Sequence, residues 1–582
     1  MLLNRHIRNS VFKFNRCLQT QPQVQAPAPL PCGPVFKNAQ SFPDRIALRD
    51  NISNYTYANI FLSANELSKN ISNLLNGRTN ERVLFLCPND ANYVVTLWAI
   101  WLSGQIAVPL SPLHPKNVLL YYANDTNSKL LITTPRYADL MQRVSRNTHS
   151  QLHVLDDKLK LNCTQKFAEN QSELEGGQTL EFYDSSDALI LYTSGTTGSP
   201  KGVRLSHKNL QCQITTLLDA WKWSPNDVLL HTLPLHHIHG IVNALLCPMY
   251  VGAKTVMLKK FNANTTWSYL LGVGSKPEDR KISVYMAVPT IYSKLIEEYR
   301  RVFENDPKMV EYIKNTLKNK VRLMVSGSSP LPVPVFERWL EISGHRLLER
   351  YGMTETGMIL SNIYESDREP GYVGVPLPGV SVRLAEETED GGSKTVLECT
   401  NKNGTIIFNK YKDGTPKGRA VKNWMTCQLR APGQRRRRLR RLLQQAGGDP
   451  QGIHRRRLVQ DGDICEYSTD KKKFRMLGRK NFDIIKSGGY KISALEVETH
   501  LLAHPDVAEC VVVGVADEKW GQKVAAVVVP RKDKEISLES LSEWAGKSMP
   551  KYSVPTVLKV VNEIPKNSMG KVNKRELLKA FF

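Results

Sequence analysis

The 582-residue chain lacks two features that mark membrane-spanning and disulfide-rich secreted proteins. No uninterrupted apolar run approaches the roughly 18 residues that a membrane-spanning helix needs, so we expect no transmembrane segment. The ten cysteines are scattered singly between Cys17 and Cys510, without a Cys-x-x-Cys pair. This spacing argues against zinc sites and a disulfide framework, and it favours reduced thiols in an intracellular compartment.

Acidic residues are also missing from the start of the chain, where none precedes Asp44. Residues 1–20 instead carry Arg5, Arg8, Lys13 and Arg16, which interrupt any continuous apolar core. This composition is typical of a mitochondrial transit peptide, and the alternative is a disordered basic tail of a cytosolic protein. We therefore assign residues 1–34 to a transit peptide and a Gln/Pro/Ala-rich linker, and we expect the protein in the mitochondrial matrix.

The formal net charge of +24 is concentrated rather than spread along the chain. Ten arginines face the single Asp449 between residues 430 and 458. No basic helix interleaved with aromatic residues accompanies them, so we expect no nucleic-acid partner.

One short stretch combines a predicted strand, a loop of hydroxyls and glycines, a lysine and a helix start. Leu189 to Tyr192 predict a buried strand, and Ser206 predicts a helix N-cap. The loop between them consists of Thr193, Ser194, Gly195, Thr196, Thr197 and Gly198, and Lys201 follows. Exposed backbone N–H groups, hydroxyls and an ammonium together suit phosphate binding, and the spacing is not that of a Walker A loop.

The length of the chain predicts two or more domains. A strand at 83–87, a helix at 93–102 and a strand at 106–110 indicate a layered α/β domain with parallel strands. Three later segments, 229–240, 284–290 and 321–328, each place a strand before a polar or glycine-bearing turn. Ligands gather where the strands of such sheets end.

Further polar clusters follow in the second half of the chain. Thr354 is suited to donate to a phosphate, and Glu355 is suited to hold a Mg²⁺ ion that bridges phosphate oxygens. A turn-rich segment at 371–379 leads into a smaller β subdomain, and a hairpin lies between Asp463 and Arg479. Beyond residue 480, a helix at 493–502 and strands at 510–515 and 524–529 indicate a separate C-terminal domain, with Lys571 in a polar loop near its end.

Five of these motifs, in order, resemble the adenylate-forming superfamily of acyl-CoA synthetases, luciferases and peptide-synthetase adenylation domains. They are YTSGTTGSPKGV, ERYGMTETG, DGDICEY, GRKNFDIIKSGGYKIS and PKNSMGKVNK. The resemblance runs from about Phe36 to Leu578. It implies an α/β fold whose large N-terminal domain, 35–479, combines layered α/β subdomains with a β subdomain, followed by a small mobile α+β C-terminal domain, 482–582. A hinge lies at Lys480-Asn481.

The resemblance also implies roles for individual residues. The phosphates of ATP are assigned to Thr193, Ser194, Gly195, Thr196, Thr197, Gly198, Lys201 and Thr354, and Mg²⁺ to Glu355. The adenosine is assigned to Ser326, Gly327, Ser328, Tyr351, Asp463 and Arg479. Lys571 bridges the attacking carboxylate and the α-phosphate, and a loop with Lys486, Gly488 and Gly489 replaces it when coenzyme A reacts.

Within the superfamily, LPLHHIHGIVNALLCP, MAVPTIYSKL and RLMVSGSSPLP are most similar to the members that activate malonate. This implies an ATP-dependent malonate–CoA ligase that forms an acyl-adenylate and releases AMP and pyrophosphate, with methylmalonate as a second candidate acid. His237, also a catalytic candidate, and His239 are assigned to the acyl pocket. Lys294 is our candidate for binding the distal carboxylate, with Arg322 as the alternative, and a solvent-facing helix position would instead leave Lys294 without such a role.

Two other functions remain open from the sequence. One is a short- or medium-chain acyl-CoA synthetase, and the other is a catalytically impaired protein that binds acyl groups or nucleotides. The second follows from residues 430–460, which contain no aromatic residue and do not resemble the family.

We hypothesise that residues 430–460 are a compensated frameshift. Codons for Leu442 to Asp449, read one base later, can encode Tyr-Tyr-Asn-Lys-Pro-Glu-Glu. Codons for Ile453 to Asp461 can likewise encode Phe-Thr-Asp-Asp-Gly-Trp-Phe-Lys, and both strings are similar to what the family has there. The alternatives are a nuclear-localisation patch or a nucleic-acid-binding arm.

Overall fold

The computed structural model describes residues 33–156, 174–193, 200–273, 281–387, 393–402, 404–411, 421–427, 459–479, 483–488, 490–518, 520–547, 549–566 and 571–582. Several sequence predictions fall outside these ranges and stay predictions. They are the basic leader 1–20, the loop residues 194–198, the hinge at 480–481, Gly489 and nearly all of the arginine-rich block. Within the described residues, no helix combines the length and apolar character needed to cross a bilayer.

The first sheet has six strands in the order β6-β5-β3-β4-β7-β8. All neighbours are parallel except β7 and β8, which form an antiparallel pair. The strands are β3 Arg82–Leu86, β4 Ile106–Pro109, β5 Leu130–Thr133, β6 Gln151–Val154, β7 Asp187–Thr193 and β8 Lys201–Ser206. The accompanying helices are α2 Tyr57–Leu74, α3 Ala91–Leu102, α4 Lys116–Asp125, α5 Ala138–Thr148 and α6 Leu180–Ser185. The predicted parallel α/β layer is confirmed.

The second sheet is a path of fifteen strands, β18-β17-β16-β19-β20-β21-β15-β14-β13-β12-β11-β9-β10-β1-β2. Its parallel part contains β1 Ile46–Arg49, β10 Lys254–Met257, β9 Val228–His231, β11 Val284–Ala287, β12 Leu323–Ser326 and β13 Leu348–Met353. β2 Asn54–Thr56 closes one edge in the antiparallel sense. Because the strands of the parallel part share one direction, their carboxyl ends meet at one edge.

The remaining strands of this path form the predicted β subdomain and pair antiparallel. They are β14 Gly357–Ser361, β15 Tyr372–Pro376, β16 Val380–Glu387, β17 Ser393–Lys402, β18 Thr405–Tyr411, β19 Val421–Cys427, β20 Val459–Ser468 and β21 Lys473–Arg479. The predicted hairpin is β20 and β21, whose register places Asp463 opposite Arg479.

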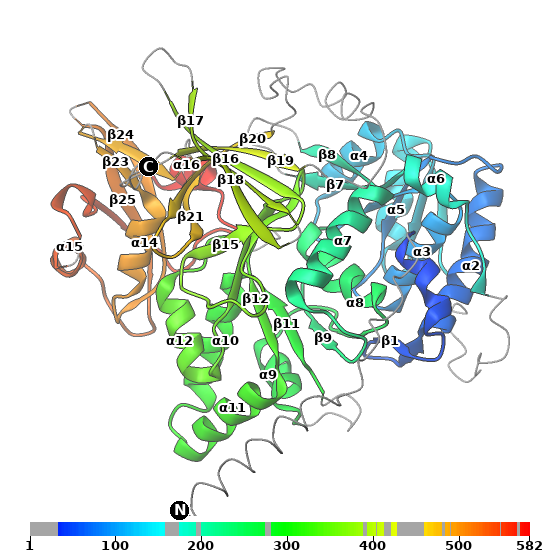
Figure 1. Cartoon of the computed structure of the whole chain (residues 1–582), viewed down its shortest axis with the longest axis horizontal. Helices are drawn as coiled ribbons and strands as arrows, with labels where there is room; N and C mark the ends of the chain where they lie inside the picture. The colour runs from blue at the N-terminus through cyan, green and yellow to red at the C-terminus, as the bar shows by residue number, and fades with distance from the viewer. Residues whose placement is uncertain are drawn as a thin grey trace, which may run out of the picture. The chain divides into compact units, whose positions relative to one another are not determined.

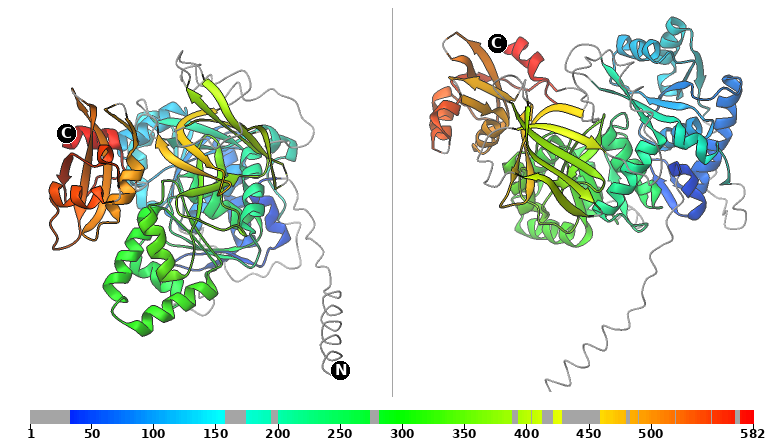
Figure 2. Two further views of the ribbon diagram at one scale, coloured as in Figure 1. Left: turned by 60° about the vertical axis from the view of Figure 1, so that its left-hand side comes forward. Right: turned by 45° about the horizontal axis from the view of Figure 1, so that its top comes forward.

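Helices α9 Ala263–Leu271, α10 Pro289–Val302, α11 Pro307–Lys320 and α12 Val333–Ser343 lie beside strands β11 and β12 (Figure 1). They stay grouped beside these strands in two further views (Figure 2). Pro289 fits the first position of α10, where its missing N–H costs nothing, and extended Val288 precedes it. The residue types around Pro289 thus end the strand and start the helix.

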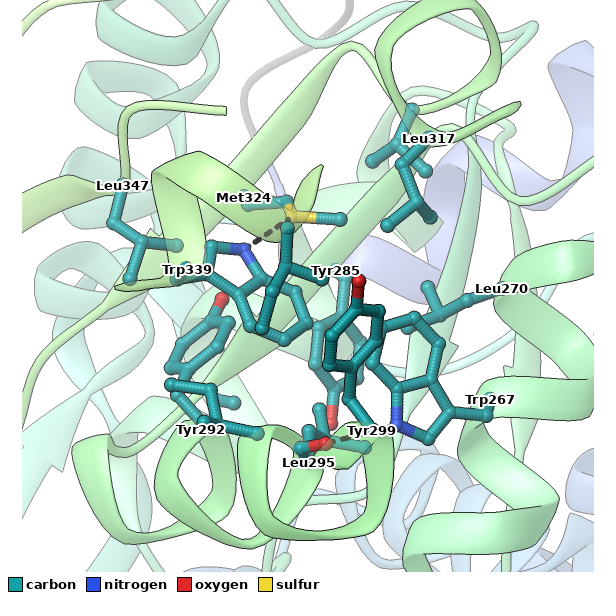
Figure 3. Packing of buried hydrophobic residues seen from close by; sticks show 14 of the residues in the cluster. Trp267, Leu270, Tyr285, Tyr292, Leu295, Tyr299, Leu317, Met324, Trp339 and Leu347 are labelled. Carbon is teal, nitrogen blue, oxygen red and sulfur yellow. Dashed lines mark hydrogen bonds between the residues drawn. The ribbon is translucent and has the colours of Figure 1, made fainter. Parts of the chain in front are cut away.

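A buried aromatic cluster joins these helices to the sheet (Figure 3). The Trp267 and Trp339 rings lie 5.7 Å apart, and Trp339 Nε1 lies 3.1 Å from the Met324 sulfur on β12. Tyr292 O–H donates to the carbonyl of Val325 at 3.0 Å. Each of these rings removes a large apolar area from water, so the cluster fixes β12, the strand that leads into the candidate site.

Helix α7, His207–Trp221, confirms the predicted start after the phosphate loop. Ser206 is its N-cap and accepts from the backbone N–H of Asn209, and the Asn209 side chain accepts from the Ser206 N–H. This reciprocal pair satisfies two otherwise unpaired donors at the helix start.

The C-terminal region has its own sheet, β23-β22-β25-β24, with β26 paired to β25. The strands are β22 Ile484–Ser487, β23 Tyr490–Ser493, β24 Val507–Asp517, β25 Gly521–Pro530 and β26 Val557–Val560. The helices are α14 Ala494–Leu502, α15 Leu538–Gly546 and α16 Lys574–Phe581. Successive residues of β24 point to opposite faces of the sheet, and Val512 and Val513 belong to two separate apolar clusters. Helices therefore cover both faces of the sheet. This region is the α+β unit that the sequence predicted.

Candidate active site

The candidate site lies at the carboxyl ends of the parallel strands β9, β12 and β13. Ser326 is the last residue of β12, and Gly327 and Ser328 follow it. Tyr351 lies within β13, and Thr354 and Glu355 form the turn after that strand. The structure therefore brings together predicted residues from two strands.

The Ser326–Ser328 turn is tightly built. The hydroxyl of Ser326 is buried and has no hydrogen-bond partner among the described residues. Ser328 has a positive φ of 73°, which side-chain-bearing residues seldom adopt and which often marks functional sites. A Cβ atom at Gly327 would lie 2.7 Å from Arg350 Nε, so glycine is required for the guanidinium to pass.

Arg350, a residue that the sequence analysis did not single out, is the main charge of this site. Its side chain is 4% exposed, and one terminal nitrogen donates to Ser328 Oγ at 3.1 Å. No carboxylate of the described residues pairs with it, and its Nε lacks any partner there. Burial lowers the pKa of the guanidinium to about 9, so it stays charged at neutral pH. A buried, unpaired cation calls for an anion.

Histidines line the segment that follows β9. His239 Nδ1 lies 3.2 Å from Ser328 Oγ. His239 is also the first residue of a π-helix, His239–Leu246, and α8, Cys247–Tyr250, follows it directly. Such wide helical turns often occur at functional sites. His231 Nε2 lies 3.0 Å from the carbonyl oxygen of Gly240. A Cβ atom at Gly240 would lie 2.1 Å from the carbonyl oxygen of Pro234. His239, Ser328 and Arg350 thus form one connected polar group.

These histidines are held neutral. Burial is the main cause that lowers the pKa of both His237 and His239 well below the ordinary value. Nearby charges add to it, namely Arg350 for His239 and Lys571 for both histidines. The Nε2 atoms of both rings are buried without a partner among the described residues. Lys571, from the C-terminal region, therefore acts electrostatically on the same two histidines.

Tyr351 and Asp463, two residues predicted for the adenosine, contact each other directly. The Tyr351 hydroxyl donates to Asp463 Oδ2, and the Asp463 side chain is largely buried. Arg479 lies across from Asp463 in the β20–β21 pair. Contacts between strands that are far apart in sequence thus assemble these predicted residues.

The predicted phosphate loop is described only at its two sides. Thr193 ends β7 and is the register partner of Lys201, which begins β8 with its side chain exposed. Tyr192, next to Thr193, stacks on Tyr122 with ring centroids 3.7 Å apart and donates to Asp125 at 2.6 Å. The strand that carries the loop is therefore held by side-chain contacts beside it.

The two cations predicted to bind the distal carboxylate are placed differently from expectation. Lys294 is exposed on α10. Arg322 precedes β12 at the amino end of the sheet and makes a bidentate ion pair with Asp227, at 2.6 and 2.7 Å. This geometry disfavours Arg322 as the residue that binds the distal carboxylate, because the guanidinium is already paired at the edge opposite the candidate site.

The remaining predicted residues, Glu355, Lys486 and Gly488, are exposed. Glu355 is exposed in the turn after β13, and the described residues contain no group of three metal-ligating side chains. A single carboxylate is still sufficient for Mg²⁺, which usually takes one or two carboxylates together with phosphate oxygens. In the C-terminal region, Lys486 is exposed, and a Cβ at Gly488 would lie 2.9 Å from the Trp520 ring.

Comparisons with known proteins match nearly the whole chain. A mitochondrial malonate–CoA ligase of Xenopus laevis is 41% identical, covering 94% of this chain and 92% of its own length. The human mitochondrial malonate–CoA ligase is 40% identical over 94% and 92% of the two chains. The crystal structure of ATP-bound MatB from Rhodopseudomonas palustris matches with a TM-score of 0.73 and 25% identity, covering 94% of this chain and 99% of MatB.

Two family models match in sequence order. The AMP-binding enzyme model covers residues 35–409, and the model for the AMP-binding enzyme C-terminal domain covers residues 496–571. The arginine-rich block falls between them. The matches confirm the family expected from the motifs, and the chain belongs to the AMP-binding enzyme family.

Proposed function

We propose that this protein is a malonate–CoA ligase that works in two steps. A malonate carboxylate oxygen attacks the α-phosphorus of ATP, forming malonyl-AMP and releasing pyrophosphate. The thiol of coenzyme A then attacks the acyl carbon and releases AMP. The identity to curated malonate–CoA ligases supports this assignment, and the buried, unpaired charge of Arg350 is the structural observation that carries it.

Arg350 is our candidate for binding the distal carboxylate of malonate. The acid carries a second negative charge that does not react, and a guanidinium can bind a carboxylate through two parallel hydrogen bonds. Malonate would supply the anion that the described residues around Arg350 do not. A monocarboxylic acid would leave the cation unpaired, so the site discriminates by charge. Lys294 remains an alternative.

The reacting carboxylate is placed, in this proposal, between Lys571 and the neutral histidines. Carboxylate and α-phosphate are both anionic, so their approach requires positive charge in the transition state. Lys571 supplies it, because its charge already acts on His237 and His239. The imidazoles, kept neutral by burial, orient the acid by hydrogen bonds without competing with Arg350 for its charge.

ATP is assigned to the strand ends beside this pocket. The loop from Thr193 to Lys201, with Ser194, Gly195, Thr196, Thr197 and Gly198, and Thr354 bind the phosphates. Ser326 to Ser328 and Tyr351 border the adenine, and Asp463, oriented by the Tyr351 hydroxyl, accepts from the ribose beside Arg479. Mg²⁺ would be held by the exposed Glu355 carboxylate and would neutralise phosphate charge.

The thiol step is assigned to the loop at Lys486, Gly488 and Gly489. We expect the domain boundary at 480–481 to act as a hinge that exchanges Lys571 for this loop. The basic leader and the mitochondrial relatives support a location in the mitochondrial matrix.

The decisive test is an acid panel that measures ATP-dependent pyrophosphate release and CoA thioester formation. Malonate should be the preferred acid, with methylmalonate second, over acetate, propionate and octanoate. Preference for a monocarboxylic acid would overturn the assignment.

Arg350→Met then tests the charge assignment. Loss of a buried charge pair costs about 2–5 kcal/mol, so kcat/KM for malonate should fall at least roughly 30-fold while propionate turnover is retained. Arg346→Met, at an exposed arginine that precedes the same strand, is the control and should change neither acid. Equal losses for malonate and propionate in Arg350→Met would reject the role.

A further inference from the structure

Another lysine, Lys574, lies three residues after Lys571, at the first position of α16. The Nζ atom of Lys574 is 2.6 Å from Asp483 Oδ1 and 2.8 Å from Glu498 Oε1. All three side chains are at most 15% exposed, and Nζ itself is inaccessible to solvent. One ammonium thus joins two carboxylates from separate segments inside the C-terminal region.

The charges of this cluster depend on one another. Burial alone would lower the pKa of Lys574, but Glu498 and Asp483 outweigh it and raise that pKa. Burial raises the pKa of Glu498, and Lys574 opposes that shift. Glu498 Oε1 also accepts from the backbone N–H of Val512 on β24, which fixes the carboxylate to the sheet. Removing one partner would leave a charge buried without its partner, which is strongly destabilising.

Asp483 stands where the chain passes from β21 into the C-terminal region. A Cβ at Gly478 would lie 2.4 Å from the Cβ of Asp483, so the two backbones approach closely. The Asp483 carbonyl accepts from the N–H of Ala494 at 2.7 Å, which ties it to the start of α14. Lys574 is therefore paired with the first described residue after the predicted hinge.

A second ion pair holds the chain before Lys571. Lys566 Nζ lies 2.7 and 2.6 Å from the two carboxylate oxygens of Glu509 on β24. After Lys571, Asn573 caps α16 by accepting from the N–H groups of Arg575 and Glu576. Two described residues on either side of Lys571 are thus held by ion pairs, Lys566 to the sheet and Lys574 to the residue that follows the predicted hinge.

We propose that Lys574 is a positioning residue that sets the place of Lys571 for acyl-adenylate formation. The inference rests on the proposed function. Lys571 must reach the carboxylate and the α-phosphate together, and a misplacement of about 1 Å can reduce a rate 100-fold. The Lys574–Asp483–Glu498 cluster holds Lys574 to the residue that follows the hinge, and only two residues separate Lys574 from Lys571. It lies wholly after the hinge, so it moves with the C-terminal domain.

The test separates the two half-reactions of the full-length enzyme. Adenylation is followed by malonate-dependent exchange of pyrophosphate into ATP, and thioester formation by adding chemically made malonyl-AMP and CoA. Lys574→Met should lower the exchange rate constant roughly 10- to 100-fold, with the KM for ATP within about twofold. Thioester formation should change less than about threefold, because in the proposed function Lys571 has been exchanged for the loop at Lys486 in that step. Lys579→Met, at an exposed lysine of α16, is the matched control and should alter neither step.

A structural role alone predicts a different result, namely equal losses in both half-reactions together with a lower melting temperature. That outcome, or an unchanged exchange rate, would overturn the proposal. If Lys574→Met does not fold, the triple variant Lys574→Met, Asp483→Asn and Glu498→Gln removes the uncompensated charges. It should fold and still lose exchange selectively, and full exchange activity in it would refute the role. Wild-type enzyme without malonate-dependent exchange would instead refute the proposed function.

Discussion

Glu349, the neighbour of Arg350 on β13, offers a quantitative test of how charge is buried beside the site. Its side chain is 5% exposed, and Oε1 accepts from the N–H of Gly371 at 2.8 Å. Burial, only partly opposed by that bond and by Arg475, raises the pKa of the carboxyl to about 8 from an ordinary 4.5. The folded protein therefore holds Glu349 protonated at neutral pH.

The raised pKa fixes the sign and size of a stability change. Below pH 4.5 both the folded and the unfolded chain hold the proton, so no penalty arises. Between pH 4.5 and 8 the unfolded chain loses it first, and folding stability falls by about 1.4 kcal/mol per pH unit. At pH 7 the penalty is about 3 kcal/mol at most, since local relaxation reduces it. Glu349→Gln keeps the shape and the acceptor but does not titrate, so it should remove this penalty.

The measurement is the urea midpoint of unfolding for wild type and Glu349→Gln at pH 5, 6, 7 and 8. The variant should gain stability relative to wild type as the pH rises, with the smallest difference between the midpoints at pH 5. Glu337→Gln, at an exposed position of α12, should follow wild type at every pH. Parallel curves for wild type and Glu349→Gln, or a variant less stable at pH 8, would refute a protonated, buried carboxyl.

Three further predictions concern the nucleotide, the histidines and the gene. Tyr351→Phe removes the hydroxyl that donates to Asp463. It should raise the KM for ATP roughly fivefold to tenfold, with kcat within about twofold. A change confined to the KM for malonate would contradict the assignment of Tyr351 and Asp463 to the nucleotide. Burial lowers the pKa of His231 to about 4 and of His236 to about 3. Folding stability that is present above pH 6.5 should therefore be lost as the pH falls towards 4. His236→Gln should reduce that loss by about 2 kcal/mol at pH 5, measured by acid-titration unfolding. Independent transcript reads across codons 425–465 should restore an aromatic, family-like segment, whereas an in-frame arginine tract would disprove the frameshift.

The sequence was most informative where a local pattern decides the structure. The apolar run before the phosphate loop became β7, and Ser206 became an N-cap, because both depend on residues close in the chain. The contact between Tyr351 and Asp463 agrees with the motif order and the family resemblance. Arg350 was missed, although an arginine inside an otherwise buried strand was a visible signal.

The sequence alone could not show that Arg322 is already paired. Both Arg322 and Arg350 adjoin strands of the same sheet, and a sequence does not show which end of a strand will meet an acid. Asp227, which is distant in sequence, pairs with Arg322 only after β9 and β12 take their places. The π-helix that begins at His239 and the close approach of Gly240 to Pro234 are likewise not revealed by the periodicity of the sequence.

The Arg322–Asp227 pair shows that the two ends of β12, a strand of only four residues, have different surroundings. An ion pair holds its amino end, and its carboxyl end leads into the Ser326–Ser328 turn, which we propose borders the adenine. Substitutions after the carboxyl end of the strand can thus change which substrate binds, while the ion pair at its amino end stays intact. An enzyme with this arrangement can change its acid substrate without a change of fold.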